Sequence, residues 1–280
     1  MRVWIIGKRG MLSQAFQRKC RVRGVDYLAT SRLEVNVEDE SAVRAQFETL
    51  DFTHLINCSG YTAVDRAEDE EQLAYLLNVV AVERLAKLSK KHRKKLIHFS
   101  SDYVFDGEEE SYREDARPAP LSIYGKTKEA GEKKLFEHYP GACLVRTSWL
   151  FGREGNDFVK KMVTLMQERE SLHVVSDQRG RPTYADDLAE AVLTIMDQSG
   201  IFHFANEGAI SWFEWAEIIK KKLEERNVPL RCKEIAAVST EEFGAKAARP
   251  RSSLLVTDKF VAPHWDRGLE EVLESVIKAK

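Results

Sequence analysis

The chain has 280 residues, of which 43% are hydrophobic and 31% are charged, and its formal net charge is −2. This length and composition predict a globular protein with one large domain or two interlocked ones and a sizeable core. The near balance of charge gives no reason to expect a nucleic-acid partner, and no apolar run is long enough to cross a membrane.

The four cysteines are widely separated and form no CxxC pair; they are Cys20, Cys58, Cys143 and Cys232. We expect them to be reduced and mostly buried, which indicates a cytoplasmic protein. The seven histidines are scattered and include no HExxH motif. No catalytic metal is therefore expected, while a structural metal ion at an interface is left open.

A strand, a glycine turn and a helix follow one another at the start of the chain. Residues 3–6 form an apolar run, and Gly7 and Gly10 come soon after it. Gly7 permits a tight turn, and Gly10 lets the backbone approach a pyrophosphate at the helix N-terminus, where free N–H groups favour anions. The third position of this fingerprint is Ser13 instead of glycine, and a small side chain there preserves close packing. A plain β-turn-α connection is the alternative.

The end of the second predicted strand, residues 26–29, bears on the choice of cofactor. An acidic residue usually stands at this place and accepts hydrogen bonds from ribose hydroxyls. Here Ser31 and Arg32 follow the strand, and Arg9 lies in the first turn. Hydroxyl and guanidinium groups suit the 2′-phosphate of NADPH. The sequence therefore predicts NADPH as cofactor, and Glu34 leaves NADH open.

Strands and helices continue to alternate up to Ser101. We expect a helix at 41–50, a strand at 54–57, a long helix that ends near residue 91, and a strand at 96–100. The apolar side of the long helix is predicted from six residues: Leu73, Leu76, Leu77, Val80, Leu85 and Leu88.

This alternation with short connections predicts an α/β fold with a doubly wound, Rossmann-type parallel sheet. In such a sheet, ligands bind at the carboxyl ends of the strands. Four residues fall at predicted strand ends: Gly7, Ser31, Gly60 and Ser101. Their shared location is stronger evidence for a dinucleotide site than any single motif.

Tyr124 and Lys128 carry the main signal for catalysis. They are four residues apart on a helix predicted at 121–138, so they share one face of it, one turn apart. A phenol has a pKa near ~10 and transfers protons poorly at pH 7, but a cation within ~4 Å lowers that pKa. With the hydroxyl of Ser101 nearby, the pair predicts proton transfer to an oxygen as hydride reaches the attached carbon. An ordinary amphipathic helix with a surface Tyr and Lys is the alternative.

The later elements are predicted as strands at 142–146, 172–175 and 201–204 and helices at 156–168, 184–196, 212–225 and after residue 265. We assign residues 1–148 and about 172–205 to a dinucleotide-binding domain. We assign about 149–171 and 206–280 to a smaller C-terminal lobe that binds substrate.

Several motifs occur in order along the chain: TAVDRAE, SSDYVFDG, YGKTK, RTSWLFG, DQRGRPT and ARPRSSLLVTDK. Together they closely resemble the dTDP-4-dehydrorhamnose reductase family of extended short-chain dehydrogenases/reductases (SDR), over nearly the whole chain. The resemblance implies NADPH- or NADH-dependent reduction of the 4-keto group of dTDP-4-dehydro-6-deoxy-L-mannose (dTDP-4-dehydrorhamnose) to dTDP-L-rhamnose. The expected partner is a dTDP-sugar substrate, and a homodimer is left open.

The resemblance also implies roles for individual residues. Tyr124 is the proton donor, Lys128 orients the nicotinamide ribose and tunes Tyr124, and Ser101 supplies the hydroxyl of a family threonine. The implied nucleotide contacts are Gly10, Met11, Leu12, Glu34, Val35, Ser59, Gly60 and Tyr61. The implied sugar-nucleotide contacts are Ser101, Asp102 and Trp149. Three positions depart from the family pattern: Ser13, Glu34 and Gly60.

Two rival interpretations are left open. One is a related nucleotide-sugar reductase or epimerase that acts on another sugar. The other is a non-catalytic binding subunit, because the regulatory subunit of methionine adenosyltransferase has this fold and similar motifs. A binding subunit need not keep Ser101, Tyr124 and Lys128 together, so their presence favours an enzyme. For Trp149, a core position where the lobes meet is the alternative to a substrate contact.

Overall fold

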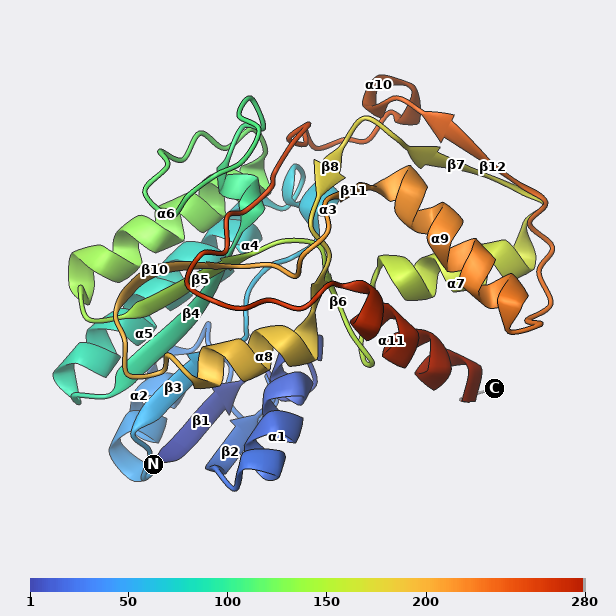
Figure 1. The fold of residues 1–280 in the computed structure, drawn as a ribbon. Helices are drawn as coiled ribbons and strands as arrows, with labels where there is room; N and C mark the ends of the chain where they lie inside the picture. The colour runs from blue at the N-terminus through green and yellow to red at the C-terminus, as the bar shows by residue number, and fades with distance from the viewer. Residues whose placement is uncertain (279–280) are drawn as a thin grey trace.

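A six-stranded parallel sheet forms the centre of the computed structural model, which describes residues 1–278 (Figure 1). Its strands are β1 (Arg2–Ile6), β2 (Asp26–Thr30), β3 (His54–Asn57), β4 (Lys95–Ser101), β5 (Cys143–Thr147) and β10 (Gly200–Phe204). They pair in parallel in the order β10-β5-β4-β3-β1-β2. The chain moves outward from β1 first to one side and then to the other, so the doubly wound fold is confirmed.

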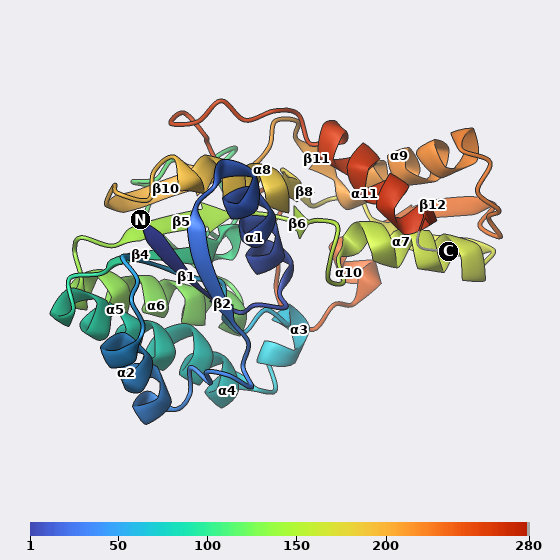
Figure 2. The same cartoon turned by 90° about the horizontal axis from the view of Figure 1, so that it is seen from below.

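Helices cover both faces of this sheet, as the view from below shows (Figure 2). One face carries α1 (Met11–Arg23) and α8 (Ala185–Leu193), and the other carries α2 (Glu40–Thr49), α5 (Ala81–Lys91) and α6 (Ile123–His138). Strand β1 shows the reason. Val3 and Ile5 pack into the core with α1 and α8, while Trp4 and Ile6 pack into the opposite core. Successive side chains of a strand point to opposite faces, so a strand covered on both faces is a continuous apolar run.

A π-helical turn interrupts the long helix that follows β3. The short α3 (Val64–Ala67) precedes this helix, which consists of α4 (Glu71–Tyr75), the π-helical turn η1 (Leu76–Val80) and α5. Ala74, Asn78 and Val79 are buried, whereas Leu73 is 37% exposed. The assignment of Leu73 to the apolar side was therefore wrong, because the extra residue in a π-helical turn shifts the 3.6-residue period.

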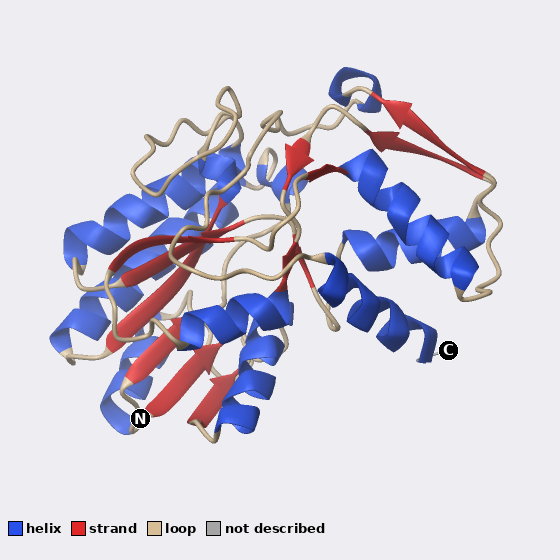
Figure 3. Ribbon diagram, in the orientation of Figure 1, coloured by secondary structure: helices blue, strands red, loops and turns tan. Residues whose placement is uncertain are grey.

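The smaller lobe has its own hydrophobic core, and Figure 3 shows its helices and short strands beside the central sheet. Its helices are α7 (Phe158–Glu168), α9 (Trp212–Glu225), α10 (Thr240–Phe243) and α11 (Asp266–Lys278). Its strands pair as β7 (Ser171–Val175) with β12 (Glu234–Val238), β6 (Leu150–Phe151) with β9 (Thr183–Tyr184), and β8 (Arg179–Gly180) with β11 (Ile210–Ser211). Trp215 is fully buried in this core, and a capping box of Ser211 and Glu214 begins its helix.

Strand β7 occupies a different place from the one expected. The sequence predicts that residues from about 172 to 205 lie in the dinucleotide-binding unit, but β7 pairs in parallel with β12. Its Leu172 and Val174 pack into the core of the lobe, and its intervening His173 is exposed. This alternation suits a two-stranded sheet with one face covered. The chain returns to the central sheet only with α8 and β10, and the folding of the two parts as separate domains stays a prediction.

A tail, residues 244–265, runs from α10 back across the nucleotide-binding unit before α11 begins (Figure 1). Leu255 of the tail is fully buried and pairs with Tyr112, which stacks on Phe105. The tail therefore packs against the loop that follows the 3₁₀-helix η2 (Asp102–Val104). Within residues 1–278, no helix is long and apolar enough to cross a membrane.

Candidate active site

Most of the predicted site residues gather at the carboxyl edge of the central sheet. Gly7 follows β1, Ser31 follows β2, Ser59 lies just after β3, and Ser101 ends β4. Trp149 follows β5, the next strand in the sheet. Because these strands are parallel neighbours, their carboxyl ends lie along one edge, where ligands bind in open α/β sheets.

The first turn of the chain has the features of a diphosphate site. Gly7 has a φ of +96°, and a Cβ there would lie 3.2 Å from the Cys58 carbonyl oxygen, so this place requires glycine. Gly10 stands at the N-cap of α1, and the first turn, which begins with Met11, holds no acidic residue. The N–H groups of this turn therefore suit an anion, and the residues present fit a dinucleotide. Ser13 is fully buried, which agrees with close packing at the third fingerprint position.

Polar side chains at the end of β2 form a cluster around Glu34. Its carboxylate accepts from the Ser31 hydroxyl at 2.7 Å and from the Ser31 N–H at 2.8 Å, and Lys8 Nζ lies 3.3 Å away. These bonds, led by the Ser31 hydroxyl, lower the pKa of Glu34 to about 2. Arg32 is exposed and pairs with Glu38 at 2.6 Å. This end of β2 thus offers a fixed carboxylate for ribose hydroxyls and two cations for a 2′-phosphate.

An asparagine from the π-helical turn holds the loop after β3. Asn78 accepts from the Tyr61 N–H at 2.9 Å and donates to the Tyr61 carbonyl at 3.2 Å. A Cβ on Gly60 would lie 3.1 Å from Asn78 Oδ1, so glycine suits this close approach. Ser59 donates to Asn57 Oδ1 through both its hydroxyl, at 2.6 Å, and its N–H, at 3.0 Å. The loop therefore presents its backbone at the sheet edge in one conformation.

The structure brings Ser101, Tyr124 and Lys128 together between β4 and α6. The Ser101 hydroxyl lies close enough to the Tyr124 phenol to lower its pKa, and Lys128 Nζ donates to the Phe99 carbonyl of β4 at 2.6 Å. A Cβ on Gly125 would collide with a carbonyl of η2, so glycine lets α6 approach the catalytic strand closely. The three side chains therefore share one buried junction of helix and strand.

Burial controls the proton affinities at this junction. It raises the pKa of Tyr124 to about 12; the hydrogen bond with Ser101 opposes the rise and the charge of Asp102 adds to it. Burial also disfavours the Lys128 cation and lowers the pKa of Lys128 to about 8, against the attraction of Glu132. Burial therefore decides the net direction, which is a raised pKa for Tyr124, and the tuning of Tyr124 by Lys128 stays a prediction. At pH 7 the phenol is neutral, which is the form that a proton donor needs.

Trp149 lies where the two units meet, in an uncommon backbone conformation. Its φ is +44°, in the left-handed region that bulky residues rarely adopt. Its ring stacks on Trp212 with centroids 3.4 Å apart, and a Cβ on Gly180 would overlap the indole. The side chain is half-buried. Packing accounts for these contacts, and a contact with substrate stays a prediction.

Comparison with known proteins agrees with this geometry. The family model described as RmlD substrate binding domain matches residues 1–277. The chain belongs to the RmlD substrate binding domain family.

Its similar relatives include the spore coat polysaccharide biosynthesis protein SpsK of Bacillus subtilis, 35% identical, with 98% of this chain and 97% of that protein covered. The chain is 33% identical to dTDP-4-dehydrorhamnose reductase of Escherichia coli, over 99% and 98% of the two chains. The solved structure of dTDP-4-dehydrorhamnose reductase from Bacillus anthracis in complex with NADP has a TM-score of 0.91 and 37% identity, over 98% of each chain. The family resemblance seen in the motifs is thereby confirmed.

Three residues that the family resemblance placed in the site bury their side chains. Leu12 and Val35 belong to the two cores that flank the sheet, so only their backbone groups can meet a cofactor. Asp102 is 2% exposed, and its carboxyl oxygens accept from Ser101 Oγ at 2.9 Å and Ser253 Oγ at 2.6 Å. A direct contact between Asp102 and a sugar nucleotide stays a prediction.

Sequence reasoning missed the residues that connect these elements. Asn78 holds the loop after β3, Ser253 bonds to Asp102, and Arg249 pairs with Asp65 of α3 at 2.6 Å. Each partner lies far away along the chain, and neither Asn nor Ser forms a distinctive spacing. For the ion pair of Arg249 and Asp65, the sequence does contain a signal: Asp65 lies in the family motif TAVDRAE and Arg249 in the family motif ARPRSSLLVTDK.

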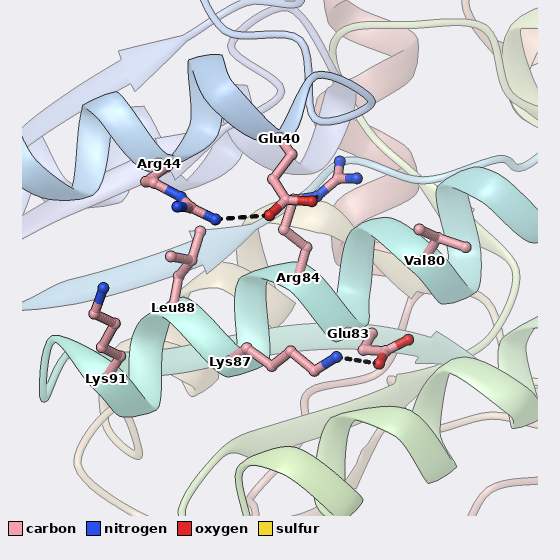
Figure 4. A pocket seen from close by; sticks show the side chains of 8 residues that line it. All are labelled: Glu40, Arg44, Val80, Glu83, Arg84, Lys87, Leu88 and Lys91. Atoms are coloured by element: carbon pink, nitrogen blue, oxygen red, sulfur yellow. Dashed lines mark hydrogen bonds and ion pairs between the residues drawn. The ribbon is translucent and has the colours of Figure 1, made fainter.

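A groove between α2 and α5 is a separate feature of the surface (Figure 4). Eight residues line it: Glu40, Arg44, Val80, Glu83, Arg84, Lys87, Leu88 and Lys91. Arg44 pairs with Glu40 at 2.8 Å and Lys87 with Glu83 at 2.5 Å. Its lining includes none of the predicted site residues, so we interpret it as a solvated, ion-paired surface.

No metal site is found among residues 1–278, because no group of three or more His, Cys, Asp or Glu side chains there is placed to hold a metal ion.

Proposed function

We propose that this family member reduces the 4-keto group of dTDP-4-dehydrorhamnose to give dTDP-L-rhamnose, with NADPH as the hydride donor. The observation that carries the proposal is the buried group of Ser101, Tyr124 and Lys128 between β4 and α6, at the sheet edge that also bears the glycine turn. The E. coli dTDP-4-dehydrorhamnose reductase, 33% identical over nearly the whole chain, supports the substrate class.

Tyr124 is the proton donor in this proposal. Its pKa of about 12 keeps the phenol protonated at pH 7, ready to protonate the substrate oxygen. The neighbouring hydroxyl of Ser101 lowers the pKa of this phenol and so favours release of its proton. Lys128, with a pKa of about 8, is mostly charged at pH 7, and a nearby cation stabilises the phenolate that forms. NADPH, when bound, supplies the hydride.

NADPH is the proposed cofactor, with NADH as the weaker one. Lys8 in the turn after β1 and Arg32 after β2 suit a 2′-phosphate, because cation–phosphate hydrogen bonds are charge-assisted. The Bacillus anthracis relative in complex with NADP supports the same cofactor. Glu34 is the feature that admits NADH, since a carboxylate at this place accepts from ribose hydroxyls.

Two alternatives compete with this proposal: a reductase or epimerase of another nucleotide sugar, and a non-catalytic binding subunit. The contact between the catalytic hydroxyls supports an enzyme over a subunit.

A cytoplasmic location and a homodimer are further parts of the proposal. In the described part of the chain all four cysteines are unpaired, which supports a reducing compartment, and two-fold dimers are the commonest oligomers. The mass of the protein in solution tests the dimer.

Reduction of dTDP-4-dehydrorhamnose generated in situ tests the function. The wild type should oxidise NADPH only when the keto sugar is present. Tyr124→Phe should lower kcat by ~10²–10⁴ and leave the Kd for NADPH unchanged. Tyr75→Phe is the matched control, because that ring is 48% exposed and should be replaceable without effect.

Each outcome of this assay separates the proposals. Turnover of Tyr124→Phe within about a factor of two of the wild type contradicts its role as proton donor. Tight NADPH binding without turnover of any keto sugar indicates the binding subunit. Turnover with a different nucleotide sugar indicates the related reductase.

A further inference from the structure

The tail carries one buried hydroxyl to the catalytic strand. Ser253 is 2% exposed, and its Oγ donates to Asp102 Oδ2 at 2.6 Å. The tail is anchored on its own around this residue. Arg249 pairs with Asp65 of α3 at 2.6 Å, and the Ser253 N–H donates to the Arg179 carbonyl at 3.1 Å. Ser253 is therefore held against Asp102 by backbone and ion-pair contacts that do not involve Asp102.

Asp102 links Ser253 to Ser101, because its two carboxyl oxygens each accept a hydrogen bond from one of these serines. Ser101 Oγ donates its single proton to Asp102 Oδ1 at 2.9 Å, so its lone pairs face other partners. The Tyr103 N–H donates to Ser101 Oγ at 3.2 Å, and the Tyr124 phenol lies near the same hydroxyl. An ionised Asp102 therefore fixes the orientation of the Ser101 hydroxyl beside the Tyr124 phenol.

We propose that Ser253 is a positioning residue for the reduction, because by holding Asp102 it orients the hydroxyl of Ser101 and, through it, the phenol of Tyr124. The inference rests on the proposed function. Burial gives the physical reason. Without Ser253, a buried carboxylate oxygen loses its donor, and an unpaired buried anion favours its protonated form. A protonated Asp102 has its own O–H to donate, so the Ser101 proton is no longer directed toward it.

The charge of Asp102 gives this role a measurable signature. Burial raises the pKa of Asp102 to about 6, while the hydrogen bonds from Ser253 and Ser101 oppose the rise. Among residues 1–278, the other titratable groups that face it are Tyr103 and Tyr124, and Arg249 faces Tyr103. Burial raises the pKa of both tyrosines, so neither they nor the guanidinium change charge between about pH 5 and 8. Removal of the Ser253 hydroxyl should raise the pKa of Asp102 further.

The experiment compares four substitutions in the full-length protein: Ser253→Ala, Ser253→Thr, Ser252→Ala and Asp102→Asn. The ¹³C carboxyl signal of Asp102, identified by its loss in Asp102→Asn, is titrated by NMR without substrate, and kcat is measured over the same pH range. In Ser253→Ala we expect the NMR midpoint and the acid limb of kcat to rise together by about one pH unit. We also expect kcat at pH 7 to fall ~10-fold with an unchanged Kd for NADPH.

The neighbouring serine offers a matched control. The Ser252 hydroxyl donates to the Glu110 carbonyl at 3.1 Å, so Ser252→Ala removes a hydroxyl from the same tail without touching Asp102. Ser252→Ala should match the wild type in both pH profiles. Ser253→Thr keeps a hydroxyl and should restore both toward wild-type values.

An unchanged NMR midpoint or an unchanged acid limb in Ser253→Ala overturns the inference. A loss of kcat that is equal at every pH, together with a lower melting temperature, overturns it too, because that is the pattern of a structural serine. A wild type that does not turn over dTDP-4-dehydrorhamnose refutes the proposed function instead. The NMR titration needs no turnover, so it still decides whether Ser253 controls the charge of Asp102.

Discussion

Replacement of Lys128 by methionine is expected to stabilise the protein while it abolishes reduction. The Lys128 side chain is 8% exposed, and its ammonium donates to the Phe99 carbonyl at 2.6 Å. Burial lowers the pKa of Lys128 from 10.5 to about 8, so the folded protein binds this proton less tightly than the unfolded chain does. Below pH 8 both states carry the charge, and the folded state bears the full cost of burying it.

The size of the effect follows from the two pKa values. One pKa unit is worth about 1.4 kcal/mol, so a fall from 10.5 to about 8 destabilises the folded wild type by about 3 kcal/mol at pH 7. The lost hydrogen bond to the Phe99 carbonyl offsets about 1 kcal/mol of this gain. Methionine replaces the aliphatic stem of lysine with little change in volume. We therefore expect a net gain of about 2 kcal/mol for Lys128→Met, or roughly 3–6 °C in melting temperature.

Urea denaturation at pH 7 and pH 10 measures this gain. The wild type should become more stable as pH rises from about 8 toward 10.5, because the unfolded chain then holds more protons. The advantage of Lys128→Met should therefore be clear at pH 7 and close to zero at pH 10. Lys126→Met, at an exposed position of the same helix, is the control and should change neither value. A variant that is no more stable than the wild type at pH 7, or whose advantage persists at pH 10, would refute the reasoning.

Three further substitutions test other parts of the structure. Arg32→Ala should weaken NADPH binding ~10-fold and NADH binding little, because a guanidinium–phosphate bond is charge-assisted; equal losses in titrations would remove Arg32 from the site. Trp149→Phe should raise KM or lower kcat for the sugar nucleotide with little change in melting; unchanged kinetics with a loss of about 1–3 kcal/mol would make Trp149 a core residue. Gly131→Ala should destabilise the protein by about 1–3 kcal/mol, because the added Cβ would collide with the Asn78 carbonyl. A Gly131→Ala melting temperature equal to that of the wild type would contradict this close contact of α6 with the π-helical turn.

The sequence by itself determined the central sheet and the edge at which the site lies. Apolar strands that alternate with helices force parallel pairing, and parallel pairing puts Gly7, Ser31, Gly60 and Ser101 at one edge. The spacing of Tyr124 and Lys128 likewise placed both on one face of α6. Both predictions depend on the spacing of residues that are close together in the sequence, so they can be made without the tertiary structure.

Only the tertiary structure decided which groups are charged and which distant segments touch. The depth of burial, which no local pattern reports, raises the pKa of Tyr124 instead of lowering it. The pairing of β7 with β12 depends on contacts with other elements of the fold. So does the π-helical turn, which buries Asn78 and leaves Leu73 exposed. Ser253 lies 151 residues beyond Asp102, and the two meet because the tail folds back over the catalytic strand. A contact of that kind depends on the path of the whole chain, since neither residue carries a local signal for the other.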